Sequence, residues 1–285
     1  MNREVFERAR FGYRLSADDN IVFLQDIAEN RPRSLFDNAY LALFRRAHEE
    51  CGAKVVLNLF YDNSSSAGFG KKREYFDLSM MPGGYKGEWR ENADWLKLSF
   101  HALREYPPAP YAAADGAAVL ADAEKVNGEI ARFAGESSLA SFATVHFGKI
   151  ADEGLEALKK AGYKGFAGYF DVTENGPAVA YGRDEAFCRR IGAEKFAEDR
   201  GTAFAKIDLC MNLAPTAAEN LAKLNGIIKR SGGKFVHIMI HEQYFYRDYA
   251  AHIKEYGEIV LGCCGRLKQC GYKGRFYSEL CGDFV

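Results

Sequence analysis

Short apolar runs alternate along this chain with segments of helical periodicity, and this alternation restricts the fold more than any other feature of the sequence. The runs have the lengths and residue types of buried strands. They are NIVFLQDI, AKVVLNLFY, WLKLSFHA, LASFATVHF, GFAGYFDV, TAFAKIDLCM and KFVHIMIHE. Strands that alternate with helices favour βαβ units and a mainly parallel sheet. About seven such units suit a closed ring better than an open sheet, so we predict an α/β fold, a deformed (β/α) barrel with about seven parallel strands.

Helix start and stop signals lie between these runs. Ser34 and Asp37 form a capping arrangement ahead of a helix that Gly52 ends. Asp115 precedes a second helix, which stops at Gly135. A third helix has the capping pair Thr216 and Glu219 and a glycine stop at 232–233. These signals place the helices where a β/α alternation needs them.

The domain organisation follows from the absence of a linker in the sequence. No stretch rich in Ser, Gly or Pro divides the chain, so we predict one domain over residues 1–285. The longest irregular segment is expected to form a loop insertion around 61–92. Loops of that length are usually functional or mobile.

Composition excludes several classes of protein. The chain has 285 residues, 48% of them hydrophobic, and a net charge of −1, which does not resemble the basic footprint of a nucleic-acid binder. The seven cysteines are odd in number and lack a CxxC pair, so we expect reduced thiols. Neither a signal peptide nor an apolar run of the ~20 residues that span a bilayer is visible. We therefore expect a cytoplasmic protein without a membrane or nucleic-acid partner.

Polar side chains follow most of the predicted strands. Ligands of parallel β/α folds bind at the carboxyl ends of the strands, so these side chains are expected to share one rim. They are Asp18, Asp19, His101, His146, Asp171, Asp208, His241 and Glu242. Each also has an ordinary interpretation. SADDN is rich in turn formers, and a lone histidine beside a core strand is more often a structural hydrogen-bonding residue than a ligand.

Aromatic residues accompany two of these positions. Tyr244 follows His241 and Glu242 within a dense aromatic segment, and HALREYPPAPY contributes Tyr106 and Tyr111. Aromatic faces cover the apolar faces of sugars, and tyrosine hydroxyls reach sugar hydroxyls. We therefore predict that Tyr106, Tyr111, Glu242 and Tyr244 bind substrate, with packing of a strand-to-helix turn as the alternative.

The order of these pieces resembles the polysaccharide deacetylase (NodB-homology) family. Its first motif pairs two aspartates, and SADDN is similar at Asp18 and Asp19. Its second motif begins with a histidine, which FHALRE supplies as His101. Its last motif is an apolar strand ending in His-Asp, and IMIHE is similar, with His241 in the histidine position. Each motif is weak alone, but their order over residues 14–246 is more specific.

Two departures from the family pattern affect the same site. The second metal histidine of the family is absent, because Glu105 stands four residues after His101. The third motif has lost its arginine and prolines, and ATVHFG in that position contributes His146. Either His146 or Glu105 restores a third ligand. We prefer His146, because it is expected at a strand end on the same rim.

The resemblance implies a glycoside hydrolase/deacetylase-like barrel and a metal-dependent hydrolase acting on carbon–nitrogen (non-peptide) or ester bonds. It implies that Asp19, His101 and His146 bind a divalent metal, and zinc suits one aspartate with two histidines. It also implies that Asp18 is the general base and His241 the general acid. The expected substrate is a small carbohydrate or related amide or ester.

Two alternatives need no metal. A barrel with rim carboxylates could be a glycoside hydrolase that uses two acids, drawn from Asp18, Asp171, Asp208 and Glu242. The barrel could also be a catalytically eroded carbohydrate-binding protein. The sequence leaves the oligomeric state open.

Overall fold

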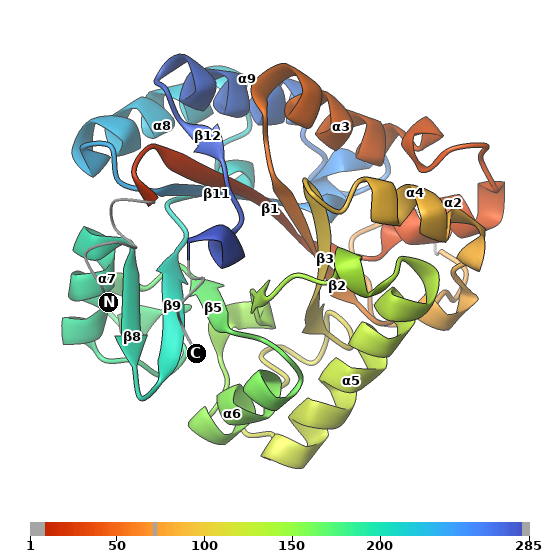
Figure 1. Cartoon of the computed structure of the whole chain (residues 1–285), viewed down its shortest axis with the longest axis horizontal. Coiled ribbons are helices and arrows are strands. Elements are labelled where there is room, and N and C mark those ends of the chain that lie inside the picture. The colour runs from red at the N-terminus through yellow and green to blue at the C-terminus, as the bar shows by residue number, and fades with distance from the viewer. Residues whose placement is uncertain (1–8, 71–72, 281–285) are drawn as a thin grey trace.

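A ring of parallel strands forms the centre of the molecule, with helices on its outside (Figure 1). The structure is a computed structural model that describes residues 9–70 and 73–280. Cys281, one of the cysteines expected to be reduced, lies outside the described residues. The other six are free thiols.

The first sheet has the strand order β10–β11–β1–β2–β3, with β12 paired to β1, and all of its pairs are parallel. Its strands are β1 (Gly12–Asn20), β2 (Val55–Phe60), β3 (Leu96–Ala102), β10 (Leu209–Cys210), β11 (Val236–His241) and β12 (Lys273–Gly274). The second sheet has the order β4–β5–β9–β8, with only the β8–β9 pair antiparallel. Its strands are β4 (Phe142–Ala143), β5 (Gly165–Gly168), β8 (Phe196–Asp199) and β9 (Thr202–Lys206). A separate antiparallel hairpin joins β6 (Asp171–Thr173) and β7 (Gly176–Ala178).

Backbone hydrogen bonds close the two sheets into a ring. On one side, the Ala140 N–H donates to the Leu98 carbonyl at 2.8 Å and joins β3 to the segment that enters β4. On the other side, β9 continues through Ile207 and Asp208 into β10. The Ile207 N–H bonds to Gly168 at 2.7 Å, and the Asp208 N–H bonds to His237 at 2.8 Å. With β9 and β10 taken as one bent strand, and with β12 lying off the ring on β1, the ring has seven parallel strands within the described residues, and the predicted deformed β/α barrel is confirmed.

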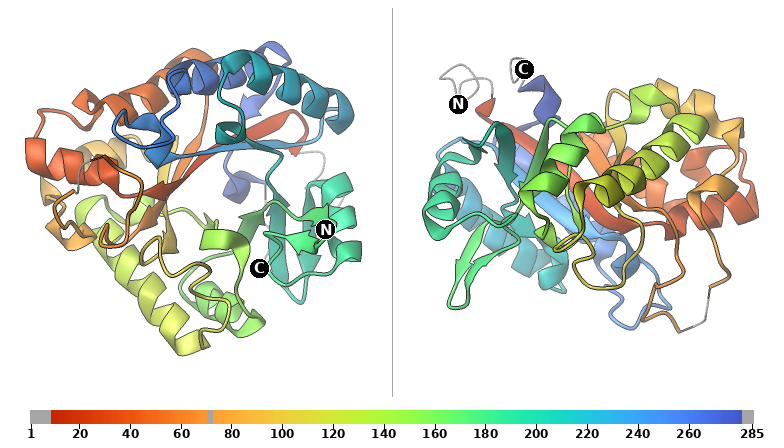
Figure 2. Two further views of the ribbon diagram at one scale, coloured as in Figure 1. Left: turned by 180° about the vertical axis from the view of Figure 1, so that it is seen from behind. Right: turned by 90° about the horizontal axis from the view of Figure 1, so that it is seen from below.

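Helices cover the outside of this ring (Figures 1 and 2). They are α2 (Val22–Asn30), α3 (Ala39–Cys51), α4 (Lys86–Glu91), α5 (Gly116–Phe133), α6 (Asp152–Lys160), α7 (Glu185–Glu194), α8 (Ala217–Ser231) and α9 (Tyr256–Gln269). Short 3-10 turns are η1 (Leu35–Asp37), η2 (Leu78–Met80), η3 (Gly83–Tyr85), η4 (Glu136–Ser138), η5 (His146–Gly148), η6 (Met211–Leu213), η7 (Glu242–Phe245) and η8 (Tyr277–Glu279). Within the described residues, no helix is long and apolar enough to cross a membrane.

The helix caps agree with most of the sequence signals. Asp115 accepts a hydrogen bond from the Ala118 N–H at 2.7 Å at the start of α5, and Gly52 ends α3 with a φ of 68°. The capping box of Ser34 and Asp37 is present, but it caps the turn η1. Asn38 caps α3 instead, because its side chain accepts the N–H groups of the first turn.

One predicted strand is wrong. NIVFLQDI forms helix α2, and the first strand is the preceding GYRLSADDN. Val22, Phe23, Leu24 and Ile27 are buried on α2, so the apolar run reflects burial of a short helix. Periodicity does not separate a short buried helix from a strand.

Strand β1 buries both of its faces. Tyr13, Leu15 and Ala17 belong to the large apolar core beneath the helices. Arg14, Ser16 and Asp18 alternate with them and are also buried, on the face toward the ring interior. This polar strip runs the length of the ring and reaches both of its ends.

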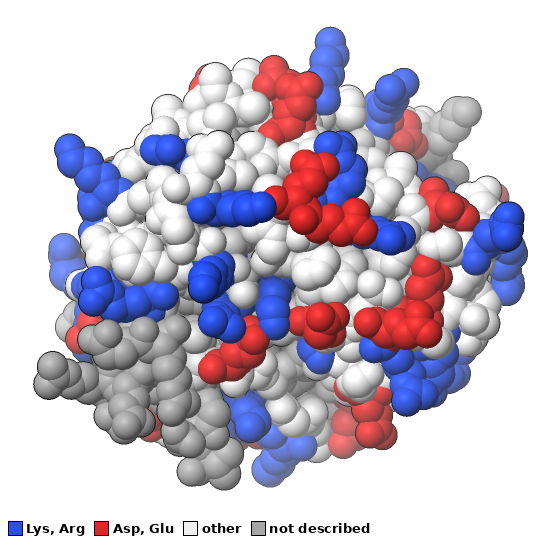
Figure 3. All heavy atoms as spheres, turned by 45° about the horizontal axis from the view of Figure 1, so that its top comes forward, with Lys and Arg blue, Asp and Glu red and all other residues white. Residues whose placement is uncertain are grey.

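The two ends of the ring differ. The right panel of Figure 2 shows the first and last described segments at one end and the long connections that follow β2, β3 and β11 at the other. Figure 3 shows acidic and basic side chains intermixed over the outer face that it presents, in keeping with the net charge of −1. The end with the long connections is where the sequence predicts a functional site.

Candidate metal centre

Adjacent aspartates at the end of β1 line the same cavity, although neighbours on a strand normally face opposite sides. Asp19 has a φ of 61°, in the left-handed region, and the pairing of β1 with β2 shifts register between Ala17 and Asn20. This irregularity turns Asp19 toward the side on which Asp18 already lies. Such conformations cost about 1–3 kcal/mol and concentrate at functional sites.

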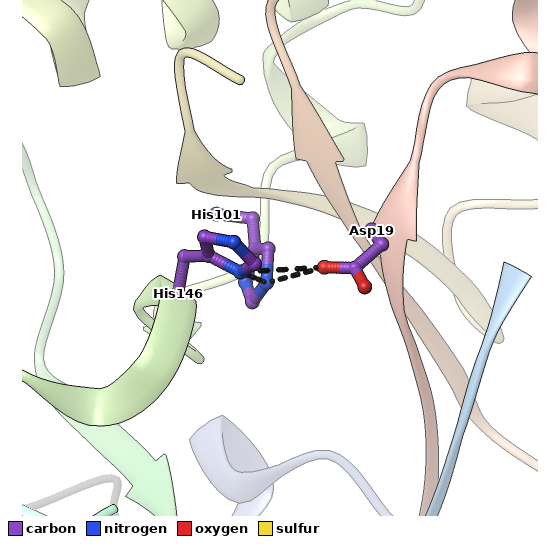
Figure 4. A group of neighbouring side chains, drawn as sticks. All are labelled: Asp19, His101 and His146. Carbon is purple, nitrogen blue, oxygen red and sulfur yellow. Dashed lines mark hydrogen bonds and ion pairs between the residues drawn. The ribbon is translucent and has the colours of Figure 1, made fainter. Parts of the chain in front are cut away.

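Three side chains from separate elements meet at this point (Figure 4). Asp19 comes from β1, His101 from β3 and His146 from the turn η5. The Asp19 Oδ1 atom lies 3.1 Å from His101 Nε2 and 3.3 Å from His146 Nδ1, and the two ring nitrogens are 3.0 Å apart. The predicted ligand atoms therefore form a nearly equilateral triangle.

Backbone carbonyls fix how both imidazoles present their nitrogens. His101 Nδ1 contacts the Thr144 carbonyl, and His146 Nε2 lies 3.0 Å from the Glu105 carbonyl. A carbonyl oxygen only accepts, so each of these nitrogens carries the hydrogen, and in the neutral rings the inward nitrogens present lone pairs. Metal-binding histidines are commonly oriented in this way by a carbonyl or carboxylate on the outer nitrogen.

This arrangement fits a cation. Two lone pairs and a carboxylate oxygen at about 3 Å repel one another unless a proton or a metal ion lies between them. Tetrahedral ligands at about 2.05 Å from zinc are about 3.3 Å from each other, close to the observed spacings. Asp19, His101 and His146 therefore form a group that could hold a metal ion.

Glu105, the alternative third ligand, has another position. Its side chain accepts a hydrogen bond from the Ala67 N–H at 3.3 Å, while its backbone carbonyl orients His146. Burial, followed by the nearby charge of Asp19, raises the pKa of Glu105 to about 7. The structure thus brings His146 into the triangle and leaves Glu105 on the cavity wall.

Electrostatics in the triangle favour an ionised aspartate. Burial alone would raise the pKa of Asp19, but the charge of His241 and hydrogen bonds with His101 and His146 hold it well below its usual range. Burial alone would lower the pKa of His101, but the hydrogen bond to Asp19 and the charge of Asp18 raise it. The Asp19 carboxylate and the His101 imidazole therefore stabilise each other's charged forms.

Asp18 and His241 lie beside the triangle on neighbouring strands. They are direct register partners in the β1–β11 pair. Asn58 donates from Nδ2 to Asp18 Oδ1 at 2.6 Å and fixes that carboxylate. His241 Nε2 is 3.9 Å from Asp19 Oδ2, so the predicted acid and base both border the predicted ligands.

Asn212 holds the ring of His241. Its Oδ1 atom accepts from His241 Nδ1 at 2.8 Å and from the backbone N–H of the same residue at 3.2 Å. Burial alone would lower the pKa of His241, but the carboxylate of Asp19, with smaller effects of Cys210 and Asp18, raises it to about 9. A protonated imidazole with Nε2 toward the cavity is the form that a general acid needs.

The cavity around these groups has a volume of ≈ 370 Å³. Tyr106 and Tyr244, two predicted substrate-binding residues, line it together with the aromatic side chains of Phe147, Tyr169 and Tyr249. Tyr244 and Tyr249 pack edge to face, with ring centroids 5.3 Å apart. An aromatic wall beside polar groups is typical of sugar-binding clefts.

Two other predicted substrate-binding residues are not at the cavity, and their placement corrects the sequence interpretation. Tyr111 is 3% exposed, and its hydroxyl accepts from the Leu103 N–H and bonds to Asp122. Glu242 is fully buried, and its carboxylate accepts the N–H groups of residues 21–23 at 2.6–2.9 Å. Both residues stabilise the fold around the site.

The remaining rim carboxylates also have structural partners. Asp208 contacts Lys195 and accepts the His237 N–H at 3.0 Å, so it does not hold His241. Asp171 lies exposed on the β6–β7 hairpin and pairs with Lys206 at 2.8 Å. Among the four carboxylates considered for a metal-free glycosidase, only Asp18 lines the cavity.

Sequence analysis missed three side chains that hold the site. Gln243 donates from Nε2 to Asp19 Oδ2 at 3.0 Å, and Asn58 and Asn212 fix the acid–base pair. Asn58 lies near the carboxyl end of β2, and Gln243 follows the carboxyl end of β11. A polar residue inside or just after an apolar run was therefore the sequence signal that could have identified them. Asn212 follows the short strand β10 and had no comparable pattern.

Replacing Glu242 with glutamine is expected to reduce the free energy of unfolding by about 1–3 kcal/mol. The amide NH₂ group would face N–H donors of Ile21, Val22 and Phe23, and a buried donor would lose its acceptor. Urea unfolding measures the change. Glu49→Gln, at an exposed position on α3, is the matched control and should stay within about 0.5 kcal/mol of the wild type. Equal stability of the two variants would contradict the capping role of Glu242.

The fold and the site together define the class of protein: a deformed β/α barrel with an Asp-His-His group at the carboxyl ends of its strands. No protein-family model matches the sequence, and no curated protein matches it. Solved structures do match.

One similar structure is the 4-alpha-glucanotransferase from Thermococcus litoralis, with a TM-score of 0.55 and 12% identity. The match covers 97% of this chain and 41% of the other, so the chain spans about two fifths of that enzyme's length. The Bc1960 peptidoglycan N-acetylglucosamine deacetylase matches with a TM-score of 0.48 and 11% identity, over 96% of this chain and 90% of that one. A family 4 acetyl xylan esterase from Clostridium thermocellum matches with a TM-score of 0.46 and 11% identity, over 94% and 89% of the two chains.

The similar structures thus include polysaccharide deacetylases at low identity, the family that the motif order resembles. The match with a TM-score of 0.55, at 12% identity, supports the fold alone.

Proposed function

We propose that this chain is a metal-dependent hydrolase that removes an acyl group from a small carbohydrate or a related amide or ester. The observation that carries the proposal is the triangle of Asp19, His101 and His146 ligand atoms, with Asp18 and His241 beside it. An acid–base pair next to a cation site supplies the groups that metal-assisted hydrolysis of an acyl group uses.

The proposed resident ion is a divalent metal, with zinc the best match to one carboxylate and two imidazoles. When bound by Asp19, His101 and His146, it supplies the positive charge that polarises a substrate carbonyl and acidifies water. Gln243 holds the second oxygen of Asp19, and the Thr144 and Glu105 carbonyls hold the two rings. The ligand set is therefore positioned before any ion arrives.

Asp18 accepts the proton of the attacking water in this proposal. Asn58 holds Oδ1 of its carboxylate, which leaves Oδ2 to take the proton. Asp18 is 3% exposed and lines the cavity, so its carboxylate can reach a water bound there. His241 gives its proton to the leaving nitrogen or oxygen, and Asn212 keeps its Nδ1–H turned away from the cavity.

The proposed substrate class follows from the cavity walls. Tyr106, Tyr244 and Tyr249 offer aromatic faces and hydroxyl groups on one side of the acid–base pair. The volume of ≈ 370 Å³ suits one sugar unit or a compound of similar size. A small acylated sugar, met in the cytoplasm, is the substrate that we propose.

Metal analysis of the purified chain without an affinity tag tests the proposal. We expect about one equivalent of zinc or a similar ion per chain, and loss of that ion in His146→Ala. His48→Ala, on α3, is the matched control and should keep the metal. A wild type that takes up no metal, even after supplementation, would contradict the proposed mechanism. Metal binding without hydrolysis of any acyl sugar, amide or ester would instead favour the catalytically eroded, sugar-binding alternative.

A further inference from the structure

A second cavity lies at the opposite end of the ring, where the strands begin. Its volume is ≈ 260 Å³. Arg14 is the third residue of β1, Phe142 is the first residue of β4, and Lys164 directly precedes β5. Phe276 and Tyr277, in the segment after β12, also line this cavity. This cavity is distinct from the metal centre, with which it shares no lining residue.

Arg14 is the unusual group in this cavity. It is 1% exposed, and its guanidinium lies over the Tyr277 ring at 4.6 Å from the centroid. Within the described part of the chain, its Nε and Nη2 atoms have no hydrogen-bond acceptor. The Tyr277 side chain is a hydrogen-bond partner of the guanidinium, but burying the two remaining donor atoms without an acceptor is costly.

The nearest candidates for an internal carboxylate partner are used elsewhere. Asp18 lies on the same face of β1, and its charge acts on Arg14, but Asn58 binds its carboxylate about 13 Å along the strand. Glu279 pairs with Lys54 at 2.8 Å and accepts the Phe276 N–H at 2.6 Å. Neither carboxylate lines the cavity.

The charge around the cavity is positive. Lys97 and Lys164 line it with Arg14, and its described lining contains no aspartate or glutamate. Burial, and then the charge of the neighbouring Lys54, lowers the pKa of Lys97, while Asp94 acts in the opposite direction. An anion would relieve the repulsion between these cations.

We propose that this cavity binds a small organic anion, with a carboxylate or phosphate group on Arg14 and an apolar body against Phe142 and Phe276. Arginine binds both anions through paired N–H groups, and two of its donors are unused here. The volume restricts the ligand to a compound about the size of one aromatic ring with its acidic group. The site does not depend on the hydrolase proposed for the other end.

Titration calorimetry of the zinc-supplemented full chain with benzoate, phenyl phosphate and the neutral analogue benzamide tests this inference. We expect one of the two anions to bind at least about tenfold more tightly than benzamide, and the stronger one identifies the acidic group. Binding of neither anion, or binding of benzamide with equal affinity, would overturn the proposal, because the cavity would then not recognise an acidic group.

Variants locate the binding. Lys164 is exposed, so Lys164→Glu should fold, and it is expected to weaken anion binding by about threefold or more. Lys160→Glu, an exposed charge reversal on α6, is the matched control and should bind as the wild type does. Arg14→Met should abolish binding if it folds, whereas His146→Ala should leave it unchanged. An anion whose binding is insensitive to Lys164→Glu, or is lost in His146→Ala, would contradict this site.

Discussion

Asp18→Asn is expected to reduce turnover by about 10²–10⁴-fold while the protein keeps its metal and its fold. Asparagine has nearly the same shape, and its oxygen still accepts the Nδ2–H of Asn58. The variant loses only the group that would take a proton from water. The measurement pairs the rate of acyl hydrolysis with metal content on the same samples.

The matched control for this variant is Asp171→Asn, which neutralises an exposed carboxylate on the β6–β7 hairpin. It should leave both the rate and the metal content near the wild-type values. If Asp18→Asn keeps its activity, Asp18 is not the base. If it loses the metal along with the activity, Asp18 belongs to the ligand set, and the roles of the two aspartates must be exchanged.

His241→Gln is expected to reduce hydrolysis of an acetylated amino sugar by about 10²–10⁴-fold, because an amine leaves only after it gains a proton. The effect should depend on the leaving group. An acetate ester of 4-nitrophenol needs little protonation, so its hydrolysis should fall by less than about tenfold. Comparing the two substrates separates proton donation from a general loss of structure.

His252→Gln, on the loop before α9, provides the control for His241→Gln. It should affect neither substrate by more than about twofold. Equal losses on the amide and on the activated ester in His241→Gln would mean that His241 positions other groups and does not donate the proton. Its neighbour Asp19, 3.9 Å away, would then be the group to examine.

The sequence predicted the barrel because its evidence is local and repeated. The apolar run VVLNLF of β2 and the cap at Asp115 each depend on residues within one or two turns of chain, and such signals survive in the folded protein. The misread segment at α2 shows the limit. This short buried helix has as many apolar residues as a buried strand of the same length. Its first turn is capped by Glu242, which lies 220 residues away in the sequence and is not part of the local pattern.

The structure brings five of the predicted site residues together, whereas the side chains that support them were not predicted. Asp18, Asp19, His101, His146 and His241 converge because parallel strands of a closed ring end at the same rim. Tyr111 and Glu242 follow the same pattern in sequence but point into packed structure. Sequence position at a strand end does not by itself tell which way a side chain points.

The sequence by itself determined the alternation of strands and helices, and with it the rim on which the acidic and imidazole side chains gather. Only the tertiary structure decided that Asp19 turns toward His101 and His146 and that His146 and not Glu105 completes the triangle. It also decided that Nε and Nη2 of Arg14 find no acceptor among the described residues at the other end. The physical reason is how far apart in the sequence the interacting residues lie. Strand and helix patterns arise from neighbours along the chain, whereas these three outcomes depend on the register shift at the end of β1, the carbonyl that orients a ring, and the closure of the ring by segments far apart in sequence.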